Sequence, residues 1–294
     1  MNQFQRIGLV GTLDLPEVKE SLRKLESFLL SHRRDVVYEK NTAAIIDWSV
    51  DTVLSSKDFP GSIDLGIVVG GDGSMLSACR NMASIGVPLL GINRGRLGFL
   101  TDISPDEIEA RVLPVIQGDF KQTQRFMLEC NVSRNGEIIG REIAVNEVAL
   151  HPGKSARMMT FELYVDSEFV YSQRSDGLIV ATPTGSTAYS LSAGGPIMHP
   201  KLDAVVLVPM FPHPLSSRPI VVDGKSEIKL VIGETNETYP QVSFDGQMNI
   251  ACAPGDIIRI TKKPFKIRLI HPTDHNFYAT CRDKLGWASE IAAS

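Results

Sequence analysis

The chain of 294 residues lacks the features of disulfide-rich and membrane proteins. Its cysteines, Cys79, Cys130, Cys252 and Cys281, are far apart and form no Cys-x-x-Cys pair. Neither a zinc cluster nor a thioredoxin-type motif is therefore indicated. We expect the four cysteines to be buried and to pack as small apolar side chains, in a protein of a reducing compartment. No signal peptide is visible, and no apolar run reaches the ~18 residues that a membrane helix needs. We expect a cytoplasmic protein without membrane contact.

The chain also lacks an excess of positive charge. Lys and Arg number 30 and Asp and Glu number 34, which gives a formal net charge of −4. Proteins that bind nucleic acid through bulk charge are usually basic, so no nucleic-acid partner is expected. Hydrophobic residues make up 43% and charged residues 22%, which excludes a largely disordered chain. Because the net charge is negative, an anionic ligand would have to be held by a local group of residues and not by the overall charge of the protein.

Several common catalytic motifs are missing. The two Gly-Lys-Ser tripeptides have Val148 and Pro219 where a Walker A loop needs its first glycine, and a Rossmann fingerprint beginning at Gly71 fails at Leu76. The Gly-x-Ser-x-Gly pattern of many serine hydrolases is absent. Among the six histidines we expect neither a His-x-x-x-His nor a His-Glu-x-x-His spacing, and therefore no zinc site.

The first part of the chain alternates short apolar strands with helical periodicity. A helix is predicted from Pro16, because Val18, Leu22, Leu25 and Leu29 share one face. A second helix follows Gly73, with Ser74 as its expected N-cap. Strands are predicted over 7–10, 35–38, 63–69 and 87–92. Continuous apolar strands between helices indicate a parallel sheet, so we predict an α/β domain over residues 1–118.

From about residue 120 the hydrophobic period changes from 3.6 to 2. Asn135-Gly136 is a strong hairpin signal, and Asp166-Ser167 is expected to turn another strand back. Strands are predicted over 126–133, 159–165, 178–181, 205–208, 220–222, 228–232, 257–260 and 267–270, and a short helix over 277–287. We predict an all-β domain over residues 119–270, a sandwich or a barrel-like sheet.

The segment Gly70-Gly71-Asp72-Gly73 follows a buried strand and precedes a helix. Glycines allow close backbone approach, and a helix N-terminus suits phosphate. A carboxylate in such a loop repels phosphate. Asp72 therefore takes a proton from a hydroxyl group, holds a metal ion that bridges phosphates, or simply caps the helix.

Polar clusters in the second half offer further candidates. Asn146-Glu147 interrupts an apolar alternation, so one side chain needs a partner unless the strand lies at an edge. Arg174 and Asp176 share a face if the strand that follows extends back to them; otherwise they form a surface ion pair. Residues 182–195 combine small polar residues with Tyr189, which suits a sugar or ring ligand better than a flexible loop. The turn at 245–247 is equally a plain hairpin or a site.

Taken together and in this order, these motifs resemble those of bacterial NAD kinases, and the resemblance runs from about residue 6 to 287. The resemblance rests on residues 70–73, 91–93, 98–100, 146–147, 175–177, 182–190 and 245–247. Of these, residues 182–190, here called the threonine-rich segment, are the most specific to the family. The resemblance implies transfer of the γ-phosphoryl group of ATP to the 2′-hydroxyl of the adenosine ribose of NAD. It also implies NAD binding between an α/β and an all-β domain, with residues 271–294 packing back on the first.

The resemblance assigns roles to individual residues. Asp72 would be the proton acceptor with Gly73 beside it, and Asn146 and Glu147 would hold the adenosine ribose region. The NAD site would be lined by Arg157, Arg174, Asp176, Thr187, Ala188, Tyr189, Ser190, Leu191, Ser192 and Gln247. A divalent cation, Mg²⁺, is expected, with its ligands unassigned. The substrates would be NAD and ATP, and the assembly a homodimer or homotetramer. The alternatives are a non-catalytic dinucleotide sensor and a lipid or sugar kinase that shares only the 70–73 loop.

Overall fold

The computed structural model describes residues 4–82, 86–94, 98–154, 157–237 and 239–287. The chain divides into two compact units, Met1–Gln124 together with Ile267–Ser294, and Arg125–Lys266. Both divisions fall within long strands, β6 (Lys121–Arg134) and β17 (Ile257–His271). They lie a few residues from the boundaries expected from the sequence.

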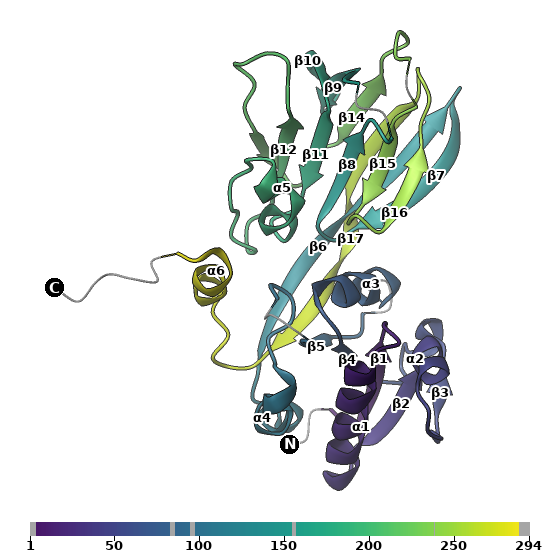
Figure 1. Cartoon of the computed structure of the whole chain (residues 1–294), viewed down its shortest axis with the longest axis vertical. Coiled ribbons are helices and arrows are strands. Elements are labelled where there is room, and N and C mark those ends of the chain that lie inside the picture. The colour runs from purple at the N-terminus through teal and green to yellow at the C-terminus, as the bar shows by residue number, and fades with distance from the viewer. Residues whose placement is uncertain (1–3, 83–85, 95–97, 155–156, 238, 288–294) are drawn as a thin grey trace, which may run out of the picture. The chain divides into compact units, whose positions relative to one another are not determined.

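A parallel sheet forms the centre of the first unit (Figure 1). Its order is β17-β5-β4-β1-β2-β3, and every pair along it is parallel. The strands are β1 (Arg6–Gly11), β2 (Asp35–Glu39), β3 (Val53–Leu54), β4 (Leu65–Val69) and β5 (Leu89–Ile92), completed by the end of β17. β4 is buried throughout, as its continuous apolar sequence predicted.

The helices of this unit are α1 (Pro16–Ser31), α2 (Lys40–Ile45), α3 (Asp72–Met82), α4 (Ile108–Gln117) and α6 (Phe277–Leu285). α1 buries the face predicted from its periodicity, and Leu22 and Leu25 are completely covered. The predicted N-cap of α3 is wrong. The helix begins at Asp72, so Ser74 lies inside its first turn, where its hydroxyl accepts a hydrogen bond from Thr12.

Part of the first unit was not predicted. Residues 40–58 form α2, the short strand β3 and a 3₁₀ turn (Ser56–Asp58), none of which has a long apolar pattern. α4 contains Pro114 and ends at Gly118 in the left-handed conformation (φ 102°). Because proline is unfavourable inside a helix, local propensity did not predict α4.

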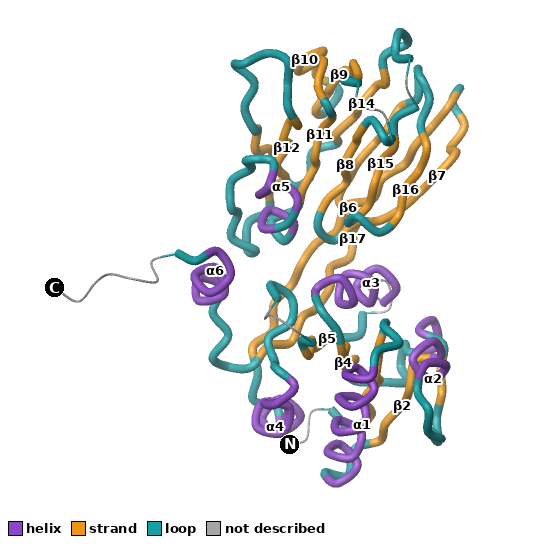
Figure 2. The backbone as a smooth tube through the Cα atoms, viewed as in Figure 1, coloured by secondary structure: helices purple, strands orange, loops and turns teal. Residues whose placement is uncertain are grey.

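The second unit consists of antiparallel sheets (Figure 2). One contains β10-β9-β14-β17, with β6 paired to β17 and β7; the other has the order β13-β12-β11-β8-β15-β16. The strands not yet given are β7 (Glu137–Ala144), β8 (Glu147–His151), β9 (Met159–Val165), β10 (Glu168–Ser175), β11 (Gly177–Ala181), β12 (Ala204–Met210), β13 (Ile220–Asp223), β14 (Ile228–Ile232), β15 (Gln241–Phe244) and β16 (Met248–Ala251). The all-β prediction is confirmed.

Both predicted hairpin turns are present. Asn135 and Gly136 have positive φ between β6 and β7, and Asp166 and Ser167 have positive φ between β9 and β10. One strand prediction is wrong, because the two segments expected over 257–260 and 267–270 are a single strand. Its first part pairs with β14 and its last part with β5, so the residues between them, including Pro264, continue as extended chain.

The second sheet is buried on both faces, and this arrangement positions the candidate site. Val148, Leu178 and Leu207 point to the core between the two sheets. Their neighbours Ala149, Ile179 and Val206 face a second apolar cluster that includes Met198. The chain after β11 therefore lies over the outer face of this sheet.

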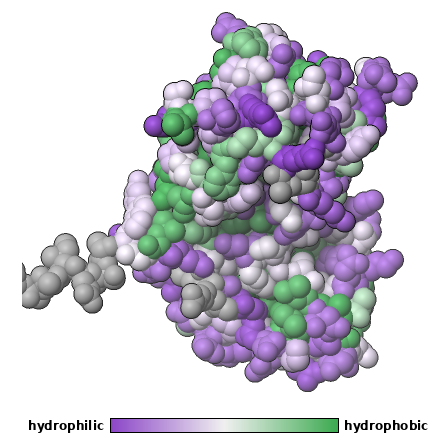
Figure 3. Space-filling model, turned by 45° about the horizontal axis from the view of Figure 1, so that its top comes forward, coloured by the Kyte–Doolittle hydropathy of each residue, from purple (hydrophilic) through white to green (hydrophobic). Residues whose placement is uncertain are grey.

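The surface is mixed in polarity (Figure 3). The most exposed large apolar side chains include Leu215 at 91% and Phe211 at 78%. Over the residues that the structure describes, no helix has the length and apolar character needed to cross a membrane. All four cysteines are free and buried, as expected, and burial raises the pKa of the Cys252 thiol to about 12.

Candidate active site

Asp72 is the first residue of α3 and follows the glycines at the end of β4. Its Oδ2 accepts a hydrogen bond of 2.7 Å from the backbone N–H of Phe99. Its Oδ1 accepts hydrogen bonds of 3.0 Å from the N–H of Leu100 and 3.3 Å from the hydroxyl of Thr101. A carboxylate offers about four acceptor positions, so these three donors fix its orientation and leave room for one more. Gly73 is the next residue of the helix.

The contact between Asp72 and the loop after β5 requires a glycine. A Cβ atom at Gly98 would overlap Oδ1 of Asp72 and the hydroxyl oxygen of Thr101. The loop therefore approaches the carboxylate through bare backbone. Residues 95–97, which complete the glycine-containing stretch noted in the sequence, lie outside the described residues.

Asp245 holds the backbone at Asn146 in the second unit. Its Oδ1 accepts hydrogen bonds from the N–H of Val145 (3.0 Å), Asn146 (2.7 Å) and Glu147 (3.3 Å). Asp245 is 8% exposed and has a positive φ in the turn between β15 and β16. The sequence presented this segment as either a hairpin or a site. Asp245 is both a turn residue and the anchor of the Asn146-Glu147 pair.

Glu147 begins β8 and is 5% exposed, and its Oε2 has no hydrogen-bond partner within the described chain. Burial raises the pKa of this carboxyl to about 8, with a further upward contribution from the Asp245 charge. A hydrogen bond with the backbone of Tyr189 acts in the opposite direction. At neutral pH Glu147 is therefore mostly a protonated acid that can donate a hydrogen bond.

The threonine-rich segment is ordered. It forms a 3₁₀ turn (Gly185–Thr187) and the short helix α5 (Tyr189–Ser192). The hydroxyl of Thr182 donates to the carbonyl of Val145 at 2.7 Å. A Cβ atom at Gly185 would overlap the carbonyl oxygen of Asn146, so this glycine allows the segment to pack directly on the site backbone. The alternative of a flexible loop is wrong.

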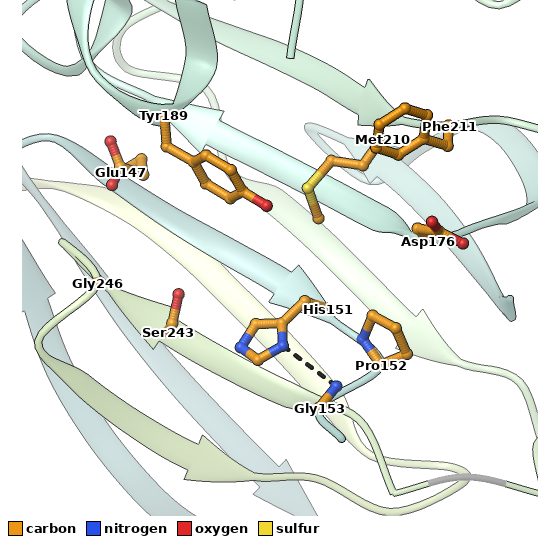
Figure 4. A pocket seen from close by; sticks show the side chains of 10 residues that line it. All are labelled: Glu147, His151, Pro152, Gly153, Asp176, Tyr189, Met210, Phe211, Ser243 and Gly246. Carbon is orange, nitrogen blue, oxygen red and sulfur yellow. Dashed lines mark hydrogen bonds between the residues drawn. The ribbon is translucent and has the colours of Figure 1, made fainter. Parts of the chain in front are cut away.

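A pocket of about 510 Å³ lies in the second unit (Figure 4). It is lined by Glu147, His151, Pro152, Gly153, Asp176, Tyr189, Met210, Phe211, Ser243 and Gly246. The ring of Tyr189, which is 49% exposed, extends across the opening toward the side chain of Met210 (Figure 4). Two carboxyl groups and exposed apolar side chains suit a ligand that has a flat ring and polar hydroxyl or amide groups.

The structure brings together only part of the residue set expected from the sequence. Glu147, Asp176 and Tyr189 share the pocket, and Gln247 follows Gly246 in the turn beside it. The side chain of Arg157 is 71% exposed and pairs with Glu237. Thr187, Ala188, Ser190, Leu191 and Ser192 belong to the segment that carries Tyr189 without lining the pocket themselves.

Arg174 and Asp176 do not belong to one strand. β10 ends at Ser175 and β11 begins at Gly177, in the other sheet, so the condition for a shared face is not met. Arg174 is exposed, and the N–H of Asp176 donates to the carbonyl of Met210 at 3.0 Å. Sequence reasoning missed Met210 and Phe211, which end and follow β12, because apolar residues after a strand carry no recognisable site signal.

The expected Mg²⁺ ion has no evident protein cage among the described residues. Asp72 has three of its acceptor positions filled, and the Asp245 carboxylate is occupied by backbone N–H groups. Burial raises the pKa of Glu147 to about 8, which disfavours its anionic form, and Asp176 is the other carboxyl group of the pocket. Mg²⁺ prefers several charged or carbonyl oxygens and retains water, so these few free oxygens fit an ion that is held mainly by other ligands.

Comparison with known proteins identifies the family. The ATP-NAD kinase N-terminal domain matches residues 7–120, and the ATP-NAD kinase C-terminal domain matches residues 145–272. A NAD kinase from Marinobacter nauticus is 69% identical over the whole of both chains. A NAD kinase from Hahella chejuensis is 58% identical over 98% of each chain.

Solved structures agree with this result. Yeast NADH kinase complexed with NADH superposes with a TM-score of 0.88 at 26% identity, covering 100% of this chain and 91% of the other. An NAD kinase from Archaeoglobus fulgidus in complex with ATP has a TM-score of 0.75 at 26% identity, covering 95% and 98%. Fold and sequence thus define a two-unit phosphotransferase. The chain belongs to the ATP-NAD kinase family, whose general reaction is the phosphorylation of NAD by ATP.

Proposed function

We propose that this enzyme transfers the γ-phosphoryl group of ATP to the 2′-hydroxyl of the adenosine ribose of NAD, with Asp72 as the general base. Asp72 removes the hydroxyl proton, the ribose oxygen forms a bond to the γ-phosphorus, and the bond to the bridging oxygen of ADP breaks. A ribose hydroxyl is a weak nucleophile, so a base within hydrogen-bond reach accelerates its attack. The products are NADP and ADP, and the hydroxyl proton is left on Asp72, which releases it to water.

The observation that carries this proposal is the fixed orientation of the Asp72 carboxylate. Three donors from one loop hold it at the start of α3, and about one acceptor position is left for a substrate hydroxyl. A helix-capping role alone would not need contacts with a loop 27 residues away. Preorganised groups of this kind reduce the reorganisation that the transition state requires.

The pocket of the second unit is proposed as the dinucleotide site. Tyr189 offers a face for stacking on a base or nicotinamide ring, and Asp176 accepts hydrogen bonds from hydroxyl or amide donors. Protonated Glu147 donates to a substrate oxygen. Arg174 remains a candidate for contact with the NAD phosphates, from its exposed position on β10.

Mg²⁺ supplies charge neutralisation in phosphoryl transfer when it is bound. The ion would be held mainly by the phosphates of ATP and by water, because the described carboxylates offer few free oxygens.

One assay separates this function from its alternatives. The purified protein is incubated with NAD, ATP and Mg²⁺, and the product is measured with an NADP-specific dehydrogenase. Formation of NADP and ADP in equal amounts supports the proposal. Binding of NAD without turnover would indicate a sensor, and phosphorylation of a lipid or sugar in place of NAD would indicate another kinase.

A homodimer or homotetramer in the cytoplasm completes the proposal. Exposed apolar side chains on the second unit, including Phe169 at 58% and Ile138 at 57%, support association with another copy. Light scattering coupled to gel filtration gives the mass of the assembly directly, and a monomer at all concentrations contradicts this part of the proposal.

A further inference from the structure

A second group of chemically reactive side chains lies in the first unit, apart from the Asp72 carboxylate. It comprises Asp102, His271 and His275, whose ligand atoms all lie within 4.8 Å of one another. Nδ1 of His275 lies 2.9 Å from Oδ1 of Asp102, and Nδ1 of His271 contacts Oδ2 of the same carboxylate. The two imidazole rings are stacked with their centroids 4.0 Å apart.

The expectation that the sequence has no His-x-x-x-His spacing is wrong, because His271 and His275 are four positions apart. They do not lie on one helix. His271 is the last residue of β17, and His275 belongs to the turn before α6 (Figure 1). Asp102 follows β5 in the same unit.

We propose that Asp102, His271 and His275 form a binding site for a divalent transition-metal ion of the Zn²⁺ class. Two imidazole nitrogens and one carboxylate oxygen are a donor set that Zn²⁺ accepts, with a fourth position open to water. Zn²⁺ bonds of about 2.1 Å place tetrahedral ligand atoms roughly 3.4 Å apart. The three ligand atoms lie within 4.8 Å of one another, so ion binding requires the side chains to adjust to that spacing.

The surroundings of the group also match a metal site. A metal-bound imidazole usually donates its other N–H to an acceptor. Nε2 of His271 lies 2.7 Å from the hydroxyl oxygen of Thr123, which can accept that hydrogen bond when Nδ1 binds the ion. A shift from the Nδ1–H to the Nε2–H tautomer frees Nδ1, so neutral histidines bind the ion without losing a proton.

Burial and charge support the same assignment. His271 is 1% exposed, and the side chains of Asp102 and His275 are 11% and 12% exposed, so an ion bound there is largely shielded from bulk water. The cation Arg111 is paired with Asp274 at 2.7 Å, and this pairing reduces its repulsion of an ion bound at the adjacent His275.

Metal titration of the untagged full-length protein tests the proposal. After treatment with a chelator, calorimetry and elemental analysis are expected to show one Zn²⁺ per chain, and Zn²⁺ is expected to raise the melting temperature. Mg²⁺ at the same concentration gives no such increase, because it prefers oxygen ligands. Co²⁺ in place of Zn²⁺ reports the coordination geometry through its visible absorption.

Two substitutions assign the ion to this group. His275→Gln and His275→Ala are expected to weaken Zn²⁺ binding at least tenfold, whereas His213→Ala, which removes an exposed histidine of the second unit, leaves it unchanged. Circular dichroism verifies that these variants are folded. No Zn²⁺ binding by the unmodified chain, or equal binding in the His275 variants, overturns the proposal.

Discussion

The carboxylate of Asp245 accepts a 2.7 Å hydrogen bond from the backbone N–H of Asn146, 99 residues earlier in the chain. The same carboxylate binds the N–H groups of Val145 and Glu147. A single turn residue thus fixes the backbone at the start of β8 and places Glu147 at the pocket. It also brings a negative charge close to Glu147, which helps to keep that carboxyl protonated.

Asp245→Asn is expected to lower both stability and NAD affinity. An amide retains one acceptor oxygen but turns an NH₂ group toward backbone donors, and a buried donor without a partner costs about 1–3 kcal/mol. Chemical denaturation and NAD titration measure the two effects. Asp223→Asn, in an exposed turn where Asp223 accepts a bond from the N–H of Lys225, is the matched control and changes neither. Equal behaviour of the two variants contradicts the anchoring role.

Gly98→Ala is expected to reduce kcat at least tenfold with little change in NAD affinity. The added methyl group overlaps the Asp72 carboxylate and displaces it or the 99–101 loop. Displacement of a catalytic group by about an ångström is enough for such losses. Steady-state kinetics and NAD calorimetry separate the two effects. Unchanged kcat in a correctly folded variant shows that the contact between loop and carboxylate has no catalytic role.

Glu147 makes stability depend on pH in a defined direction. Its pKa is raised from 4.5 in the unfolded chain to about 8 in the folded protein, so the folded state holds the extra proton between these values. The resulting stabilisation is complete below pH 4.5 and is lost as the pH rises toward 8, with a slope of about 1.4 kcal/mol per unit. Glu147→Gln removes this contribution.

The measurement is urea denaturation of both proteins between pH 5 and pH 9. The stability of Glu147→Gln relative to the unmodified enzyme is expected to increase across this interval and to level off above the pKa of about 8. A difference that stays constant with pH shows that Glu147 is already ionised in the folded protein.

Tyr189 is expected to contribute to NAD affinity through its ring. Stacking on a base is worth roughly 1–3 kcal/mol by alanine substitution, so Tyr189→Ala is expected to weaken NAD binding about 5- to 150-fold. Tyr189→Phe retains the ring and binds NAD nearly normally. Calorimetric titration of both variants tests this assignment. Equal losses in the two variants would show that the hydroxyl group, not the ring, carries the interaction.

The sequence predicted those parts of the fold that local pattern determines. The buried strand β4, the amphipathic helix α1 and the turn at Asn135-Gly136 each have a strong periodic or conformational signal. β17 was expected as two strands, because Pro264 and its lysine neighbours interrupt the pattern, while its continuity depends on pairing with strands distant in sequence. Such long-range pairing is invisible to local periodicity.

For the candidate site as well, the sequence indicated individual polar residues but not the residues that contact them. The place of Asn146-Glu147 in an apolar strand predicted that one of their side chains needs a partner, but Asp245 binds the backbone N–H groups of this pair, and Oε2 of Glu147 has no hydrogen-bond partner within the described chain. The position of Asp245 depends on the register of β15 with β8. Met210 lines the pocket because of where strand pairing places the end of β12, which local sequence does not determine. The hydrogen bonds of Asp72 to the 99–101 loop likewise depend on the adjacent positions of β4 and β5.

The central claim is that Asp72 removes the proton from the ribose hydroxyl, and Asp72→Asn tests it most directly. General-base catalysis contributes roughly 10²–10⁴-fold, so kcat for NADP formation is expected to fall by that factor. Asp72 does not line the pocket proposed for NAD, so calorimetry is expected to show NAD affinity within a few fold of the unmodified enzyme. A kcat that remains within a few fold, in a variant that still binds NAD, would contradict the account.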